Sequence, residues 1–142
     1  MSQFKETIPP VEKVLKDFEK FCNSKIVLQN HNNLIQCFIY HTISQLNKHF
    51  LTGNFSDGLL LVEGIEEKLK EYEIYLDRHR ILVIYYKIAS MYFGTGNYET
   101  AIDYLNKIIN WKVDLRNDLQ CYARLLHLIA HYELGNYQLL EY

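Results

Sequence analysis

Three copies of one short string constrain this chain more than any other feature of its sequence. The strings are Thr52-Gly53-Asn54-Phe55, Thr95-Gly96-Asn97-Tyr98 and Leu134-Gly135-Asn136-Tyr137. Glycine readily adopts the left-handed conformation that ends a helix, and an asparagine can then cap the next helix by accepting from its free N–H groups. The aromatic residue can pack back on the helix that has just ended. Each string therefore predicts a tight helical hairpin, with turns near residues 52–55, 95–98 and 134–137.

Apolar residues at helical spacing fill the segments between these turns. They predict a first helix that Pro9-Pro10 opens and that reaches about residue 28. Later helices are expected near residues 34–51, 55–75, 78–94, 98–109 and 118–134, with Asp77 as the N-cap of the fourth. No segment alternates apolar and polar residues between hairpin turns, so no sheet is expected. The predicted fold class is all-α.

The length of the chain fits one domain, and we expect residues 1–142 to form a single helical-repeat domain. Only five residues follow Tyr137, and a helix of that length is marginal alone. We therefore expect the last repeat to be truncated and the chain to be a fragment of a longer protein.

One segment resembles a known repeat family. Its residues Tyr85, Ile88, Ala89, Tyr92, Gly96, Tyr98, Ala101, Leu105 and Ile108 stand at the spacings of the tetratricopeptide repeat (TPR) consensus. The three turn glycines are 43 and 39 residues apart, against about 34 in the family, so longer helices are expected. The chain is similar to bacterial tetratricopeptide-like proteins. The resemblance implies a right-handed α-solenoid of stacked antiparallel hairpins, with Gly53, Gly135 and the residues above as structural repeat positions.

In that family the first helix of each hairpin lines a concave face that binds a partner protein or peptide. Here each first helix carries a stripe of polar residues, so the resemblance implies a partner-binding face. Its candidate residues are Tyr40, Ser44, Asn47, Tyr86, Lys87, Ser90, Arg124, His127 and His131. The alternative is that these stripes are simply solvated helix faces.

The expected function is a protein- or peptide-binding scaffold without catalysis or cofactors. The alternative is an oligomerisation or structural segment of a larger regulatory protein. The helix near residues 118–134 is rich in Leu125, Leu126, Leu128 and Ile129, and the chain ends before a full partner helix follows it. A homodimer through the C-terminal helices is therefore expected if no other segment covers them.

Other classes of function receive little support. A net charge of −2 offers no clustered cations for nucleic acid, and the longest strongly apolar run, residues 81–86, is far short of the roughly 20 that a membrane helix needs. The N-terminus lacks a signal peptide, and three cysteines without CxxC spacing suit a reduced compartment, so a cytoplasmic protein is expected.

Two residue pairs were candidates for chemistry. His127 and His131 stand four apart, as two metal ligands could, but no Glu follows His127 and Arg124 shares the stripe. Cys37 and His41 have the same spacing, but no orienting group or oxyanion site accompanies them. A polar or buried role is expected for both pairs, with metal binding and thiol catalysis as the alternatives.

Overall fold

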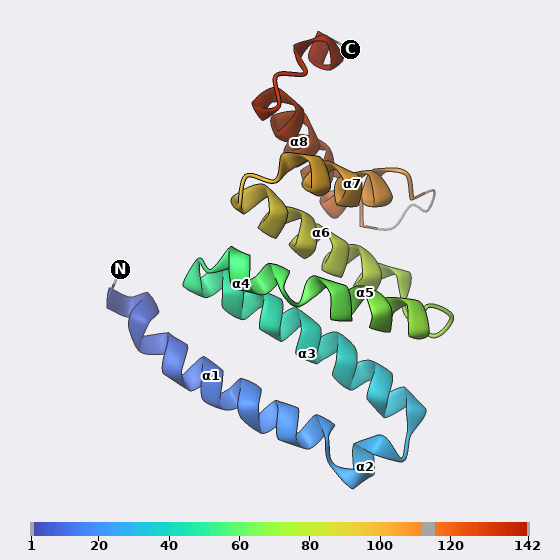
Figure 1. Ribbon diagram of the computed structural model, residues 1–142. Helices are drawn as coiled ribbons and strands as arrows, with labels where there is room; N and C mark the ends of the chain where they lie inside the picture. The colour runs from blue at the N-terminus through green and yellow to red at the C-terminus, as the bar shows by residue number, and fades with distance from the viewer. Residues whose placement is uncertain (1, 112–115, 142) are drawn as a thin grey trace. The chain divides into compact units, whose positions relative to one another are not determined.

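The computed structural model describes residues 2–111 and 116–141 (Figure 1). The described residues form helices and turns and no strand, so the all-α prediction is confirmed. The chain divides into two compact units, Met1–Leu76 and Asp77–Tyr142. That all 142 residues form one helical-repeat domain stays a prediction.

The first unit is built on two long helices. Helix α1 (Ser2–Cys22) and helix α3 (His31–Thr52) lie side by side, joined by the short helix α2 (Lys25–Leu28), and α4 (Phe55–Leu59) and α5 (Val62–Glu71) follow α3 (Figure 1). Its most deeply buried side chains are Val27 of α2 and Ile35, Ile39 and Leu46 of α3. The side of α3 that these residues leave open carries the polar stripe described below.

Two predicted helices of this unit differ from the observed ones. The prediction that Pro9-Pro10 opens a helix reaching residue 28 is wrong, because α1 begins at Ser2, where Gln, Lys and Glu favour helix, and ends at Cys22. Ser24 then takes an extended conformation and precedes α2, as expected for a residue type that competes with helical hydrogen bonding.

The helix predicted over residues 55–75 is two helices. Between α4 and α5 the N–H of Leu60 donates to the carbonyl of Asp57, and that of Leu61 to Gly58, over three residues instead of four. Glycine weakens a helix interior, and a buried Gly58 stands at this tightened turn. Helix α5 ends at Glu71, four residues before the predicted end.

The second unit follows the prediction more closely. Helices α6 (Arg78–Gly94) and α8 (Asn117–Glu133) both pack against α7 (Tyr98–Ile109). Asp77 caps α6 by accepting from the N–H of His79 at 3.0 Å, as predicted. The helix predicted to follow Gly135 is a five-residue 3₁₀ helix, η1 (Tyr137–Glu141). Of the loop predicted over residues 110–117, residues 112–115 lie outside the described part of the chain.

The three predicted turns share one geometry. Gly53, Gly96 and Gly135 have φ of 67°, 79° and 74°. The asparagine N–H that follows each glycine donates to the carbonyl five residues earlier, at 3.1, 3.0 and 3.0 Å, which is the bond that closes a Schellman motif. Asn54 and Asn97 also cap the next helix with their side chains.

The aromatic residue of each string packs on the helix before it. The ring pairs are Phe50–Phe55, Phe93–Tyr98 and Tyr132–Tyr137, with centroids 5.4, 5.2 and 5.5 Å apart and edge-to-face geometry in each. This arrangement is the favoured one for aromatic side chains. Three sequence-distant turns therefore repeat one local structure.

Between α6 and α7 the residues of the tetratricopeptide-like pattern lie at the contact. Ala89 on α6 and Ala101 on α7 are fully buried. Tyr85 and Tyr92 both contact the ring of Tyr104, with centroids 5.8 Å away in each case. Small residues thus allow the two helices to approach, and tyrosines fill the space at either side.

Candidate protein-binding surface

The predicted residues of the first unit lie along one stripe of α3. Tyr40, Ser44 and Asn47 are spaced by four and three residues, which places them on one helix face. Tyr40 and Asn47 are exposed and Ser44 is half-buried. The stripe faces α1, because each of its residues lines a hollow that α1 lines from the other side.

The first hollow holds two of the predicted residues. It has a volume of about 340 Å³ and lies between α1 and the second half of α3. Its lining is Pro10, Val11, Val14 and Leu15 from α1, with Ser44, Asn47, Lys48 and Leu51 from α3. A concave site with apolar walls and a few polar groups is the usual form of a small recognition pocket. Here the apolar walls can take an aliphatic side chain while Ser44 and Asn47 offer hydrogen-bonding groups to a backbone.

A second hollow lies farther along the same helix pair. Its volume is about 250 Å³, and Tyr40 is one of its wall residues. The others are Phe18, Phe21, Ile26, Val27, Asn33, Gln36 and Cys37. The α3 residues of the two hollows are centred about eleven positions apart, or roughly 16 Å along the helix axis. An extended peptide spans that distance with about five residues.

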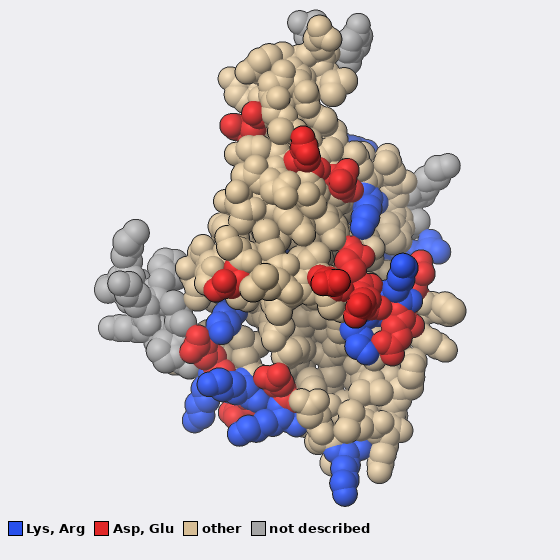
Figure 2. All heavy atoms as spheres, in the orientation of Figure 1, with Lys and Arg blue, Asp and Glu red and all other residues tan. Residues whose placement is uncertain are grey.

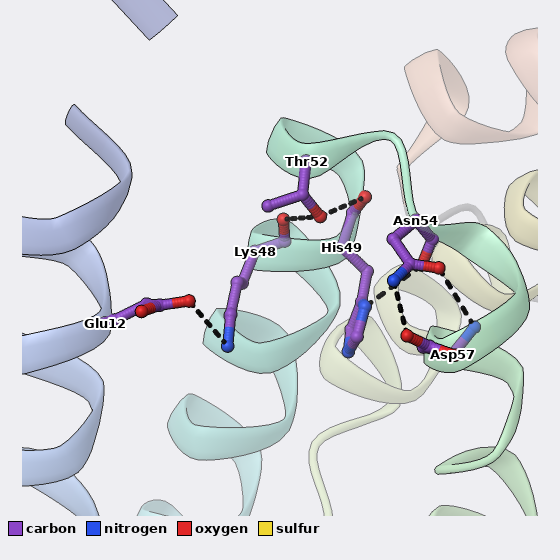
Figure 3. A network of polar contacts seen from close by, with 6 residues as sticks. All are labelled: Glu12, Lys48, His49, Thr52, Asn54 and Asp57. Atoms are coloured by element: carbon purple, nitrogen blue, oxygen red, sulfur yellow. Dashed lines mark hydrogen bonds and ion pairs between the residues drawn. The ribbon is translucent and has the colours of Figure 1, made fainter. Parts of the chain in front are cut away.

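One ion pair joins the two helices beside the first hollow. Lys48 Nζ lies 3.3 Å from Glu12 Oε1 (Figure 3). Both side chains are partly exposed, so the pair contributes at most about 1 kcal/mol to stability. Its effect is local: it places the Lys48 side chain at the rim of the hollow.

The end of α3 is fastened by its own polar contacts, which Figure 3 also shows. Thr52 Oγ1 donates to the carbonyl of Lys48 at 3.1 Å, and His49 Nδ1 lies 3.0 Å from the carbonyl oxygen of Asn54 and donates to it. The Asn54 amide in turn donates to the Asp57 carboxylate. These contacts hold the last turn of α3, and with it Leu51, in a defined position.

Cys22, at the end of α1, and Cys37 of α3 are joined by a hydrogen bond between their thiols. Burial raises the pKa of Cys22 to about 12, with further contributions from a hydrogen bond with Cys37 and from the negative charge of Glu19. A thiol with so high a pKa is a poor nucleophile at neutral pH. The pairing of Cys37 with His41 as a catalytic pair stays an alternative drawn from the sequence.

The other predicted residues lie in the second unit, on α6 and α8. Tyr86, Lys87 and Ser90 are half-buried on α6, and Ser90 Oγ donates to the carbonyl of Tyr86 at 2.8 Å. Burial lowers the pKa of Lys87. The serine hydroxyl proton is thus used within its own helix.

On α8, Arg124 is exposed, and the rings of His127 and His131 lie 4.5 Å apart edge to face. Burial, and secondly repulsion from His131, lowers the pKa of His127. Both shifts have burial as their main cause, because removing Lys87 and His127 from water disfavours their charged forms.

Reasoning from the sequence missed the α1 wall of the site. Apolar spacing predicted a helix in this segment, but not that Val11, Val14 and Leu15 form one side of the first hollow. The spacing of Val11, Val14, Leu15, Phe18 and Phe21 is that of a single apolar stripe, so the sequence carried no separate signal for this wall. Val14 and Phe21 are in fact exposed.

Within residues 2–111 and 116–141, no three His, Cys, Asp or Glu side chains are grouped to hold a metal ion. Over the same part of the chain, no helix has the length and apolar character needed to cross a membrane. No protein-family model, curated protein or solved structure matches this chain.

Proposed function

We propose that this protein is a tetratricopeptide-like scaffold that binds a segment of another polypeptide and has no catalytic role. The observation that carries the proposal is the apolar hollow between α1 and α3, with Ser44 and Asn47 at its rim. Two residues singled out as partner-binding positions thus border a cavity of suitable size and chemistry. Three turns of the same geometry support a repeat architecture, and stacking of the helical hairpins as a right-handed solenoid is part of the proposal.

The two hollows suggest the form of the ligand. Each is large enough for one or two apolar side chains, and together they favour a peptide with two apolar anchors about five residues apart in an extended conformation. Exposed carboxylates and cations are few in the walls, so anchor shape matters more than peptide charge. The rim groups of Ser44 and Asn47 are suited to hydrogen bonds with the peptide backbone.

Selection of random twelve-residue peptides on the full chain tests this function. We expect enrichment of peptides with two apolar anchors, followed by weaker binding to Val14→Glu, because a carboxylate then stands in the hollow. Loss of one buried apolar anchor corresponds to about 1.5–3 kcal/mol, or roughly a tenfold to hundredfold rise in Kd.

Ile74→Glu is the matched control, since Ile74 is exposed and lines neither hollow. Its peptide affinity should equal that of the unmodified chain. Failure to select any peptide, or equal binding by the Val14→Glu variant, would count against the α1–α3 site.

A further inference from the structure

Helix α8 carries a second apolar face that its own unit leaves open. Tyr122, Leu125, Leu128, Ile129 and Tyr132 are 39–59% exposed. Their spacing of three or four residues places them on one side of the helix, which we call the α8 face. The ring of Tyr137 in η1 contacts Tyr132 and extends this face beyond the end of α8.

The opposite side of α8 is already occupied. Leu119, Ala123 and Ala130 are buried, and the side-chain amide of Gln120 donates to the carbonyl of Ile108 in α7 at 3.1 Å. A helix that is apolar on two sides is normally covered on both. In Figure 2 the visible atoms around the end of α8 and η1 are mostly uncharged, with a few carboxylates nearby.

The exposed area of the α8 face is large enough for a stable interface between two identical surfaces. Taking on the order of 200 Å² for a large side chain of this kind when fully exposed, the α8 face with Tyr137 leaves about 600 Å² uncovered. Two copies would bury about 1,200 Å², the lower end of the range for stable protein interfaces. Contiguous apolar patches of several hundred Å² mark interaction sites in soluble proteins.

We propose that the α8 face binds the α8 face of a second copy of this chain, with the two helices antiparallel. Pairing about the midpoint between Leu128 and Ile129 sets each of these residues beside its own counterpart. Leu125 then packs on Tyr132 of the second copy, and Tyr122 lies over its Gly135. A Cβ atom built on Gly135 would meet only Tyr137 within 4 Å, so the backbone at this glycine is not covered by other side chains.

The charges of α8 are compatible with this symmetry. Arg124 and Glu133 lie on opposite flanks of the α8 face, about 90° from its centre at 100° per residue. Each is nine positions from its counterpart along the paired helices, or roughly 13 Å, which exceeds the screening length of about 8 Å at physiological salt. Pairing therefore brings no like charges into contact, and the centre of the interface is apolar.

Sedimentation velocity of the full chain, at concentrations from about 1 μM to 1 mM, measures the predicted dimer. The double variant Leu125→Glu with Ile129→Glu should dissociate at least about a hundredfold more readily, because charge enters both halves of the interface. Ile74→Glu, the same kind of substitution at a residue 91% exposed outside the α8 face, should leave the dimer intact. Far-ultraviolet circular dichroism should be the same for all three chains.

Disulfide trapping tests the antiparallel register in a Cys121→Ser background, with oxidised glutathione as the oxidant. Leu128→Cys should form a disulfide-linked dimer rapidly, since residue 128 meets its counterpart. Leu125→Cys should not, because its counterpart is seven positions away, roughly 10 Å along the axis and beyond the reach of a disulfide.

A monomer over the whole concentration range would overturn the dimer, and so would a dimer that the double glutamate variant leaves unchanged. Rapid linkage of Leu125→Cys but not Leu128→Cys would overturn the antiparallel register. The peptide-binding proposal is tested at Val14 in the other unit, so either proposal can fail without the other.

Discussion

Replacement of Gly96 measures how much the repeated turn contributes to stability. Its φ is +79°, and a Cβ atom added there meets no atom within 4 Å. The Cβ atom itself therefore meets no steric conflict with neighbours, and the main cost of a side chain is the backbone strain of the left-handed conformation. That strain is about 1–2 kcal/mol for an ordinary residue and greater for a β-branched one, so Gly96→Val should lower the free energy of unfolding by about 1–3 kcal/mol.

Two further substitutions separate this cause from a general effect of removing glycine. Gly96→Asn should cost less than Gly96→Val, because asparagine tolerates the left-handed region. Gly64 lies inside α5, has no positive φ, and likewise has nothing within 4 Å of an added Cβ. Gly64→Ala should therefore stabilise the chain by about 0.5–1 kcal/mol, the reverse sign, because alanine favours a helix interior.

Urea unfolding provides the measurement. Trp111 is the single tryptophan and belongs to the unit that contains Gly96, so its fluorescence follows that unit. With a slope of about 2 kcal/mol per molar urea, Gly96→Val should lower the midpoint by about 0.5–1.5 M. Circular dichroism follows both units and serves for Gly64→Ala. An unchanged midpoint in Gly96→Val, or an equal loss in Gly96→Asn, would refute the argument from backbone conformation.

Three other predictions follow from the packing and the shifted pKa values. Ala101 is fully buried, so Ala101→Leu should destabilise the chain by about 1–3 kcal/mol in the same urea assay through overpacking, and a neutral result would show that the α6–α7 contact is looser than described. Burial lowers the pKa of His127 in the folded chain, so the unfolded chain, in which the His127 pKa is about 6.5, binds more protons at acidic pH. The melting temperature should therefore fall as the pH is lowered from about 7 to 5. The fall should be less steep in His127→Gln. Cys121 is exposed and should be alkylated by iodoacetamide first, whereas Cys22, with a pKa of about 12, should react only on unfolding; mass spectrometry of the labelled peptides decides this.

The turns of this protein could be read from its sequence because their causes are local. The left-handed conformation of Gly96, the cap from Asn97 and the packing of Tyr98 on Phe93 all arise within the eight residues from Phe93 to Thr100. The same holds for Asp77, whose carboxylate needs only the N–H two residues later to begin α6. Periodicity also sufficed for the all-helical class and for the extents of α6 and α7.

Local patterns were insufficient where helix continuity depended on weak preferences. Residues 55–75 have the apolar spacing of one helix, but three-residue hydrogen bonds after Gly58 divide it into α4 and α5. The extended conformation of Ser24 similarly separates α2 from α1. A single glycine or serine costs a helix only about 1 kcal/mol, so whether the helix continues there is decided by the surrounding packing.

The candidate binding surface separates most clearly what the sequence determines from what the tertiary structure determines. The sequence alone determined that Ser44 and Asn47 share one polar stripe, because helical periodicity depends only on their separation along the chain. Only the tertiary structure decided that Val11 and Val14, thirty or more positions earlier, stand across a hollow from them. The relative rotation and shift of α1 and α3 follow from how their side-chain ridges interlock, and that fit is a property of two surfaces in contact, absent from either segment by itself.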